Sequence, residues 1–337
     1  MKRFFVFVNL FLAIHPFCRV TKVGPIGITV RDMNTSIKFY SDVLSFKKIS
    51  DEDFTGTEYE NLEGVFGLHI RVVRMQLGEE QIELTDYLTS GGRSIAEDAK
   101  ANDLSFQHVA IVVSDMEKAY AQLKKFNAEF VSTAPQTLPK TIPPAEGVKA
   151  FYFHDPDNHN LELIYFPKGK GQAKWHVPTS KIFLGIDHTA IGVSNTDSSL
   201  HFYQTILGIE RKGESFNYGI EQEHLNNVEG ASLHITGLRS DAGPGIEFLQ
   251  YLKPGPGKPY PVDTKADDIW YWQTTLYVDN AERVHYALKS AGCKIISENL
   301  IDLTNETGSI VKAFIVKDPD GHAMLIKQNA NKEQARN

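Results

Sequence analysis

The sequence repeats itself once, and this repeat constrains the fold more than any other feature. Residues 23–46 (VGPIGITVRDMNTSIKFYSDVLSF) line up with residues 186–209 (IDHTAIGVSNTDSSLHFYQTILGI). Near the end of each copy, KAF followed by DPD occurs within residues 149–157 and again within 312–320. Matched positions stay about 164 residues apart along the chain, which indicates a tandem duplication.

Each copy divides again into two similar halves. Every half begins with an apolar strand, passes through a polar turn into a helix with 3.6-residue spacing, and ends with shorter strands. The connectors between halves are polar or rich in glycine and proline. The sequence therefore predicts an α+β protein of four βαβββ modules in two tandem domains, 21–167 and 183–328. The modules are 21–88, 103–167, 183–252 and 268–328.

The composition is that of a folded protein that does not bind nucleic acid. The chain has 337 residues, of which 42% are hydrophobic and 23% charged, which is enough apolar material for two ordinary cores. The formal net charge of -7 leaves no basic surface for a phosphate backbone. We expect a small-molecule partner and no nucleic acid.

Residues 1–20 are predicted to be a signal peptide or an N-terminal extension. Lys2 and Arg3 precede an apolar run over 4–14, the order found in secretory signal peptides. No small-x-small cleavage site follows, and the run is too short to span a bilayer. The location therefore stays open: periplasmic or secreted after cleavage, otherwise cytoplasmic. The two cysteines, Cys18 and Cys293, cannot form a disulfide framework.

Histidines and glutamates recur at two equivalent strand positions of the modules. In module order, the first-strand residues are Pro25, His108, His188 and Gln273, and the last-strand residues are Glu83, Glu162, Glu247 and Leu325. A carboxylate within an apolar strand is costly unless it faces water, a cation or a metal. One such residue alone could simply face solvent or be a satisfied core residue. Their recurrence in successive modules indicates a shared site.

With these motifs, residues 21–328 resemble the vicinal-oxygen-chelate superfamily of glyoxalases, bleomycin resistance proteins and extradiol dioxygenases. In that family two modules curl their sheets into a U-shaped cleft, and the metal ligands lie on the first and last strands. The resemblance implies tandem domains of this type that bind one divalent metal ion. It points to no other cofactor.

Which modules pair decides where the metal lies. If sequence neighbours pair, both clefts hold an incomplete set: Pro25, Glu83, His108 and Glu162 in one, and His188, Glu247, Gln273 and Leu325 in the other. If the middle modules pair, as in fused two-copy glyoxalases, one cleft collects His108, Glu162, His188 and Glu247. We favour the middle pairing because it brings every strong ligand together. This set suits Zn, Ni, Co, Mn or Fe(II), and a monomer is expected because the duplication replaces a dimer.

The resemblance implies a glyoxalase I-like isomerase or lyase, or an epimerase. The cation would hold two vicinal oxygens of a small substrate and stabilise an enediolate, while Glu162 moves a proton between adjacent carbons. Gly192 and Tyr251 stand where glyoxalase I has an arginine and an asparagine. Because that arginine holds the glutathione carboxylate, this departure argues against a glutathione substrate.

Two alternatives stay open. An extradiol dioxygenase normally takes two histidines and a glutamate from the C-terminal copy, where Gln273 and Leu325 replace two of them. Such a site could still form from His108, His188 and either Glu162 or Glu247. A non-enzymatic binding protein would hold its ligand by shape and aromatic side chains. Residues 270–272 (WYW) could line a cleft between the first and fourth modules, or they could pack in the core.

Several further residues are weaker candidates. Tyr251, Tyr165 and Asn227 could contact substrate, although packing or turn geometry also explains them. His159 and His322 lie in DPDNH and DPDGH turns, for which we expect a structural role.

Overall fold

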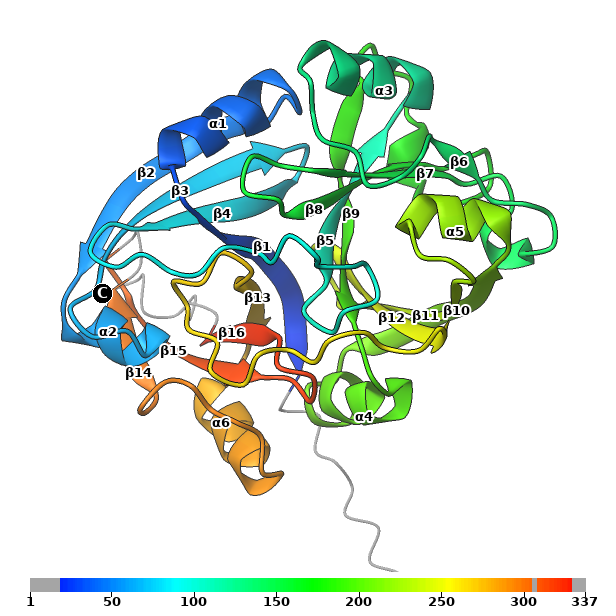
Figure 1. Ribbon diagram of the computed structural model, residues 1–337. Coiled ribbons are helices and arrows are strands. Elements are labelled where there is room, and N and C mark those ends of the chain that lie inside the picture. The colour runs from blue at the N-terminus through cyan, green and yellow to red at the C-terminus, as the bar shows by residue number, and fades with distance from the viewer. Residues whose placement is uncertain (1–18, 305–307, 329–337) are drawn as a thin grey trace, which may run out of the picture.

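The computed structural model describes residues 19–304 and 308–328, so residues 1–18 of the predicted leader, including Cys18, lie outside the described residues. Four modules follow one another along the chain (Figure 1). The first comprises β1 (Val20–Val30), α1 (Met33–Asp42), β2 (Lys47–Thr55), α2 (Thr57–Glu63), β3 (His69–Leu77) and β4 (Glu80–Tyr87). The second comprises β5 (Gln107–Val113), α3 (Met116–Lys125), β6 (Gln136–Thr137), η1 (Pro143–Ala145), β7 (Lys149–His154) and β8 (Asn160–Tyr165), followed by η2 (Ala173–His176).

The second copy repeats this order. Its first module comprises β9 (Phe183–Gly192), α4 (Thr196–Leu200), η3 (His201–Ile206), β10 (Glu210–Tyr218), α5 (Ile220–Asn226), β11 (Ser232–Arg239) and β12 (Gly245–Lys253). Its second comprises β13 (Trp272–Val278), α6 (Ala281–Ser290), β14 (Ile301–Thr304), β15 (Ile310–Lys317) and β16 (Ala323–Gln328). The predicted α+β class is confirmed. No helix among the described residues is both long and apolar enough to cross a bilayer.

The helix after the first strand begins in the same way in all four modules. A short polar side chain at the N-cap accepts a hydrogen bond from the backbone N–H three residues later, which satisfies one of the free donors of the first turn. These N-caps are Asp32 (2.7 Å), Asp115 (3.1 Å), Asn195 (2.9 Å) and Asn280 (2.9 Å). Each helix therefore starts within a few residues of the end of the first strand.

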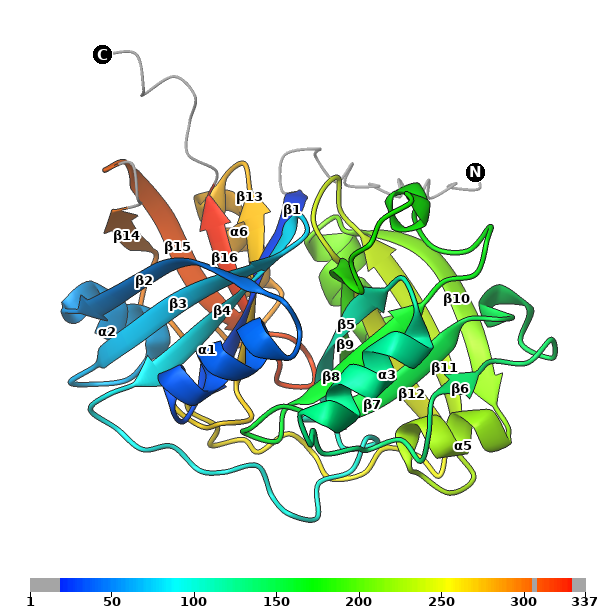
Figure 2. The ribbon, with the colours of Figure 1, turned by 90° about the horizontal axis from the view of Figure 1, so that it is seen from above.

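The strands form two eight-stranded sheets that lie side by side (Figure 2). The inner sheet has the order β10-β11-β12-β9-β5-β8-β7-β6 and joins the second and third modules. The outer sheet has the order β14-β15-β16-β13-β1-β4-β3-β2 and joins the first and fourth. In each sheet the two first strands pair antiparallel at the centre, β5 with β9 and β1 with β13. The middle modules thus share one sheet, which is the pairing favoured from the ligand positions.

The strand register is the same in all four modules. Each last strand runs parallel to its first strand, and its candidate residue pairs with the position two residues after the first-strand candidate. The pairs are Glu83 with Gly27, Glu162 with Ala110, Glu247 with Ala190, and Leu325 with Thr275. Because side chains two residues apart share a face, the first-strand and last-strand candidates of every module point to the same side of their sheet.

The two largest cores follow the sequence copies rather than the sheets. One is built mainly from the first two modules, and helices α1 and α3 pack into it through Met33, Tyr40, Met116 and Leu123. The other is built from the last two modules and contains Phe202, Phe248, Val284 and Phe314. Each copy of the duplicated unit therefore has its own core, while each sheet takes one module from each copy.

Buried Asp-His pairs hold neighbouring modules together. The Asp155 carboxylate accepts a hydrogen bond from the Tyr40 hydroxyl at 3.0 Å and contacts His159 Nδ1 at 2.9 Å. His159 Nε2 lies 2.6 Å from the carbonyl oxygen of Ile269, at the start of the fourth module. In the second copy Asp318 likewise accepts from Tyr203, and His322 Nε2 contacts the carbonyl oxygen of Gly192. These contacts give His159 and His322 a structural role.

Candidate metal centre

Three side chains converge on the concave face of the inner sheet. His108 from β5, Glu162 from β8 and His188 from β9 each offer a ligand atom, and these atoms all lie within 4.8 Å of one another. Glu162 Oε2 is 3.1 Å from His108 Nε2 and 3.5 Å from His188 Nε2. All three residues are at most 5% exposed. Two imidazoles and a carboxylate are thus buried and face one small volume.

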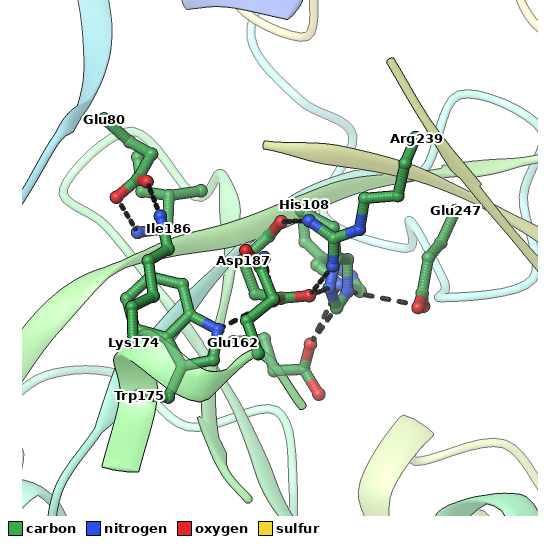
Figure 3. Close-up of polar contacts among 11 residues, drawn as sticks. Glu80, His108, Glu162, Lys174, Trp175, Ile186, Asp187, Arg239 and Glu247 are labelled. Carbon is green, nitrogen blue, oxygen red and sulfur yellow. Dashed lines mark hydrogen bonds and ion pairs between the residues drawn. The ribbon is translucent and has the colours of Figure 1, made fainter. Parts of the chain in front are cut away.

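Glu247 on β12 approaches the same group from the side. A dashed line in Figure 3 marks the contact of Glu247 Oε2 with His188 Nε2, which are 3.3 Å apart. The side chain of Glu247 is 31% exposed. Among the described residues, the group with mutual spacing within 4.8 Å contains His108, Glu162 and His188 but not Glu247. The four predicted ligands therefore lie in one cleft as three buried donors and a fourth, more exposed carboxylate.

The hydrogen bonding of His108 fits a bound cation. Both imidazole nitrogens are buried and have no hydrogen-bond partner among the described residues, although Nε2 faces Glu162. A buried nitrogen without a partner costs about 1 to 3 kcal/mol. A divalent ion between His108, His188 and Glu162 would use the Nε2 lone pair. The donor types suit Zn, Ni, Co, Mn or Fe(II).

The charges of the cluster reinforce one another. Burial alone would raise the pKa of Glu162, but the interactions with the imidazoles of His108 and His188 outweigh it and lower the pKa to about 2. Burial would lower the pKa of His188, but Glu247, Asp187 and Glu162 raise it to about 10. Glu162 therefore remains a carboxylate at neutral pH, the form that a metal ion requires, whereas His188 has to release its proton when it binds an ion.

A residue next to the cluster was not found by sequence reasoning. Asp187 Oδ2 lies 3.1 Å from His188 Nδ1. Asp187 in turn accepts hydrogen bonds from Trp175 Nε1 at 2.9 Å and from Arg239 at 2.5 Å (Figure 3). A third hydrogen bond comes from Gln172 at 3.1 Å. This carboxylate holds the imidazole so that Nε2 points at Glu162 and Glu247. Carboxylates often orient metal-binding histidines in this way.

The superfamily to which the chain belongs is identified by matches in both copies of the repeat. A sequence profile of the Glyoxalase/Bleomycin resistance protein/Dioxygenase superfamily matches residues 22–163 and again 185–326. The chain belongs to this superfamily. Its members generally bind a divalent metal ion, and the His108, Glu162 and His188 cluster could hold one here.

Individual proteins resemble the chain to different extents. Glyoxalase I of Saccharomyces cerevisiae is 26% identical over 200 residues, which cover 54% of this chain and 55% of the yeast protein. The uncharacterized protein YwbC of Bacillus subtilis is 29% identical over 144 residues, 42% of this chain and 96% of YwbC. The crystal structure of glyoxalase I from Zea mays superposes with a TM-score of 0.60 at 17% identity and covers 92% of both chains. That structure supports the fold.

The cavity beside the cluster is the inner cleft of this superfamily member. It has a volume of about 330 Å³, and apolar residues such as Leu138, Ile164 and Leu249 line much of it. Asn217, Gln222 and Lys212 add polar groups, none of which was predicted from the sequence. Such a cavity has room for a small molecule rather than a polymer.

The weaker candidates for substrate contact lie away from the inner cleft. Tyr251 is buried, and its hydroxyl accepts a hydrogen bond from Asn226 Nδ2 at 2.6 Å. Tyr165 lies at the end of β8 beside a different hollow, and Asn227 is the left-handed C-cap of α5. At Gly192, an added Cβ would lie 2.8 Å from the Asp103 carbonyl oxygen, so an arginine cannot fit there without a shift of the backbone.

The equivalent positions of the outer sheet do not form a second metal cluster. Glu83 is held by Arg74, whose Nε and Nη2 donate to one carboxylate oxygen at 3.0 and 2.7 Å. Pro25, Gln273 and Leu325 occupy the other three positions. Two of the aromatic residues predicted from the sequence have other roles. Trp272 packs in a core, and the Arg93 guanidinium lies 4.7 Å from the centre of the Trp270 ring. Neither residue lines the cavity of the outer sheet.

Proposed function

We propose that this protein is a divalent-metal-dependent enzyme, a glyoxalase I-like isomerase or lyase, or an epimerase, that acts on a small substrate with two vicinal oxygens. The observation that carries the proposal is the buried Nε2 of His108, which lacks a hydrogen-bond partner among the described residues and lies 3.1 Å from Glu162. His108, Glu162, His188 and Glu247 would hold the ion. When bound, the ion would polarise the two substrate oxygens.

The chain itself would supply the proton transfer. Glu162 is ionised at neutral pH, since its two imidazole neighbours lower its pKa to about 2. A positioned carboxylate can move a proton from one carbon to the next, an effect typically worth 10² to 10⁴ in rate. By the family resemblance this role belongs to Glu162, while Glu247 is the more exposed carboxylate of the pair.

The residues at positions 192 and 251 favour a substrate other than a glutathione conjugate. Position 192 has no space for an arginine side chain, and the Tyr251 hydroxyl is turned to Asn226. The apolar wall formed by Leu138, Ile164 and Leu249 suits a compact organic substrate. We therefore expect a hemithioacetal of a smaller thiol, or a hydroxy-carbonyl compound without a thiol.

One observation favours a ring-cleaving dioxygenase as a second candidate. The tightest group contains two histidines and one glutamate, the donor set of non-heme Fe(II) oxygenases, and Glu247 lies outside it. If Glu247 does not bind the ion, coordination positions would remain for a diol and dioxygen.

Metal analysis tests the site first. Protein purified without chelator should contain about one divalent ion per chain, and His108→Ala and His188→Ala should each lose it. His201→Ala, which alters an exposed histidine, is the matched control and should retain the ion. Full occupancy in both cluster variants, or no metal in the wild type after reconstitution, would contradict the proposal.

Product analysis then separates the two reactions. The metal-loaded protein would be incubated with α-ketoaldehyde hemithioacetals of several small thiols, and with catechols in the presence of Fe(II) and dioxygen. A hydroxyacyl thioester would support the isomerase or lyase, whereas a ring-opened product would assign the dioxygenase instead.

A further inference from the structure

The outer sheet has a cavity of its own. It has a volume of about 440 Å³ and lies against β2, β3, β4, β13 and β16. Phe54 and Tyr59 line one wall with their ring centres 4.7 Å apart, and Leu303, Val311 and Leu325 add aliphatic surface. We call this cavity the outer cleft.

A comparison of the two sheets shows how the outer cleft differs chemically. Arg74 pairs across the strands with Glu83, and the equivalent partner of Glu247 in the inner sheet is Gly237. An arginine therefore neutralises the glutamate in the outer cleft, whereas Glu247 is left to face His188. The outer cleft has no equivalent of the three-donor metal group among the described residues.

A buried carboxylate takes the place of a neutral amide. Glu63 ends α2, and Asn226 ends the equivalent helix α5. Each lies next to a tyrosine four residues beyond the last-strand glutamate: Tyr87 for Glu63 and Tyr251 for Asn226. The amide makes a 2.6 Å hydrogen bond to its tyrosine, but the carboxylate accepts from Tyr87 at 3.4 Å. A carboxylate in place of the amide thus adds a desolvation cost, and it gains no shorter hydrogen bond to the tyrosine in return.

Glu63 retains capacity to accept hydrogen bonds. It is 8% exposed and lines the outer cleft, where it accepts hydrogen bonds from two neutral donors, the Tyr87 hydroxyl and the Gln273 amide at 3.3 Å. A carboxylate can accept about four hydrogen bonds. Lys327 lines the same cleft and its charge acts to lower the pKa of Glu63, but no ion pair joins the two side chains among the described residues. The cleft therefore offers a buried carboxyl group, an anionic acceptor once it is ionised, beside two aromatic rings.

We propose that the outer cleft is a metal-independent binding site for a small organic amine with an apolar body, whose ammonium group pairs with Glu63. A cation is the group that a buried carboxylate accepts most strongly, and charge-assisted hydrogen bonds are shorter and stronger than neutral ones. The rings of Phe54 and Tyr59 suit both the apolar body and the positive charge. The ammonium group of the ligand would lie at Glu63 and Gln273, and its apolar body would contact the apolar wall of the cleft.

The probe for this site is phenethylamine, with phenylacetate and 2-phenylethanol as anionic and neutral analogues of similar shape. Titration calorimetry with the metal-loaded protein should show saturable binding of phenethylamine at one site per chain. The affinity should fall at least tenfold in Glu63→Gln and stay unchanged in Glu58→Gln, an exposed glutamate of the same helix. Leu325→Phe, which narrows the cleft and leaves Glu63 in place, should also weaken binding.

Three results would overturn the proposal. These are equal affinity in Glu63→Gln and wild type, tighter binding of phenylacetate than of phenethylamine, and no binding of phenethylamine at millimolar concentration. Binding in His108→Ala separates the two clefts. Unchanged affinity in that variant supports the outer site even if the proposed metal chemistry fails, whereas loss of binding would assign the amine to the inner cleft.

Discussion

The carboxylate of Asp187 contacts Nδ1 of His188 at 3.1 Å, although the two residues are adjacent on strand β9. Neighbours on a regular strand point to opposite faces. Here the pairing with β5 passes from Ala110–His188 directly to Ile111–Ile186, so Asp187 is the additional residue of a β-bulge. Bulges re-aim side chains, and this one brings Asp187 behind the imidazole of a candidate metal ligand.

Asp187→Asn should lower metal affinity tenfold to a hundredfold, because the uncharged amide orients and polarises His188 less strongly. Competition with a chromophoric chelator measures the affinity. Asp197→Asn, at an exposed site in α4, is the control and should leave it unchanged. Equal affinities in both variants and in the wild type would show that Asp187 has only a packing role.

Glu162→Gln and Glu247→Gln should affect different kinetic parameters. At saturating metal, Glu162→Gln should lower kcat by 10² to 10⁴, the usual value of a positioned base. Glu247→Gln should mainly raise the metal concentration needed for half-maximal activity, because Glu247 lies at the edge of the cluster and contacts it through His188. Metal titrations of turnover distinguish the two. If the effects are exchanged, Glu247 is the base and Glu162 only a ligand.

Gly237→Arg should reduce metal binding by imitating the outer cleft. The new guanidinium would lie across from Glu247, as Arg74 lies across from Glu83, and would compete with the ion for the carboxylate. A Cβ at this position would contact its nearest atom, Glu247 Oε1, at 3.8 Å, so the backbone can accept a side chain. Gly237→Ala supplies the steric control. Metal content measured by mass spectrometry should fall in the arginine variant alone.

Glu63→Gln should change how stability depends on pH. Burial raises the pKa of Glu63 from 4.5 to about 7, and hydrogen bonds from Gln273 and Tyr87 oppose this only in part. The folded protein thus holds this proton more tightly than the unfolded chain, so wild-type stability decreases as pH rises from about 4.5 to 7. Glutamine cannot titrate, so the variant lacks this decrease.

The measurement is the free energy of unfolding by denaturant at pH 5 and pH 8. The value for Glu63→Gln relative to wild type should increase by roughly 2 kcal/mol between these conditions. Groups that titrate alike in wild type and variant cancel in this difference. The charged neighbours Glu83, Arg74 and Lys327 line the same cleft in both proteins. A constant difference would mean that Glu63 is already ionised in the folded protein at pH 5.

The repeat and the strand patterns predicted much of the architecture. Periodicity is a local property of the chain, so apolar strands and amphipathic helices could be recognised without coordinates. Because His108 and His188, or Glu162 and Glu247, recur at the same points of the repeat, their equivalence could also be read from the sequence. The common register of Glu162 with Ala110 and Glu247 with Ala190 explains why that reading identified side chains on one face.

Other features depended on which strands become neighbours. Asp187 joins His188 only because a bulge interrupts the alternation, and Arg74 reaches Glu83 only across the β3–β4 pair. Tyr251 follows a candidate ligand in sequence, yet it turns to Asn226 because a helix packs there. The chain by itself determined four modules and their four ligand positions through local pattern and repetition. Tertiary structure decided which positions meet, since contacts between distant residues depend on sheet pairing and packing rather than on spacing along the chain.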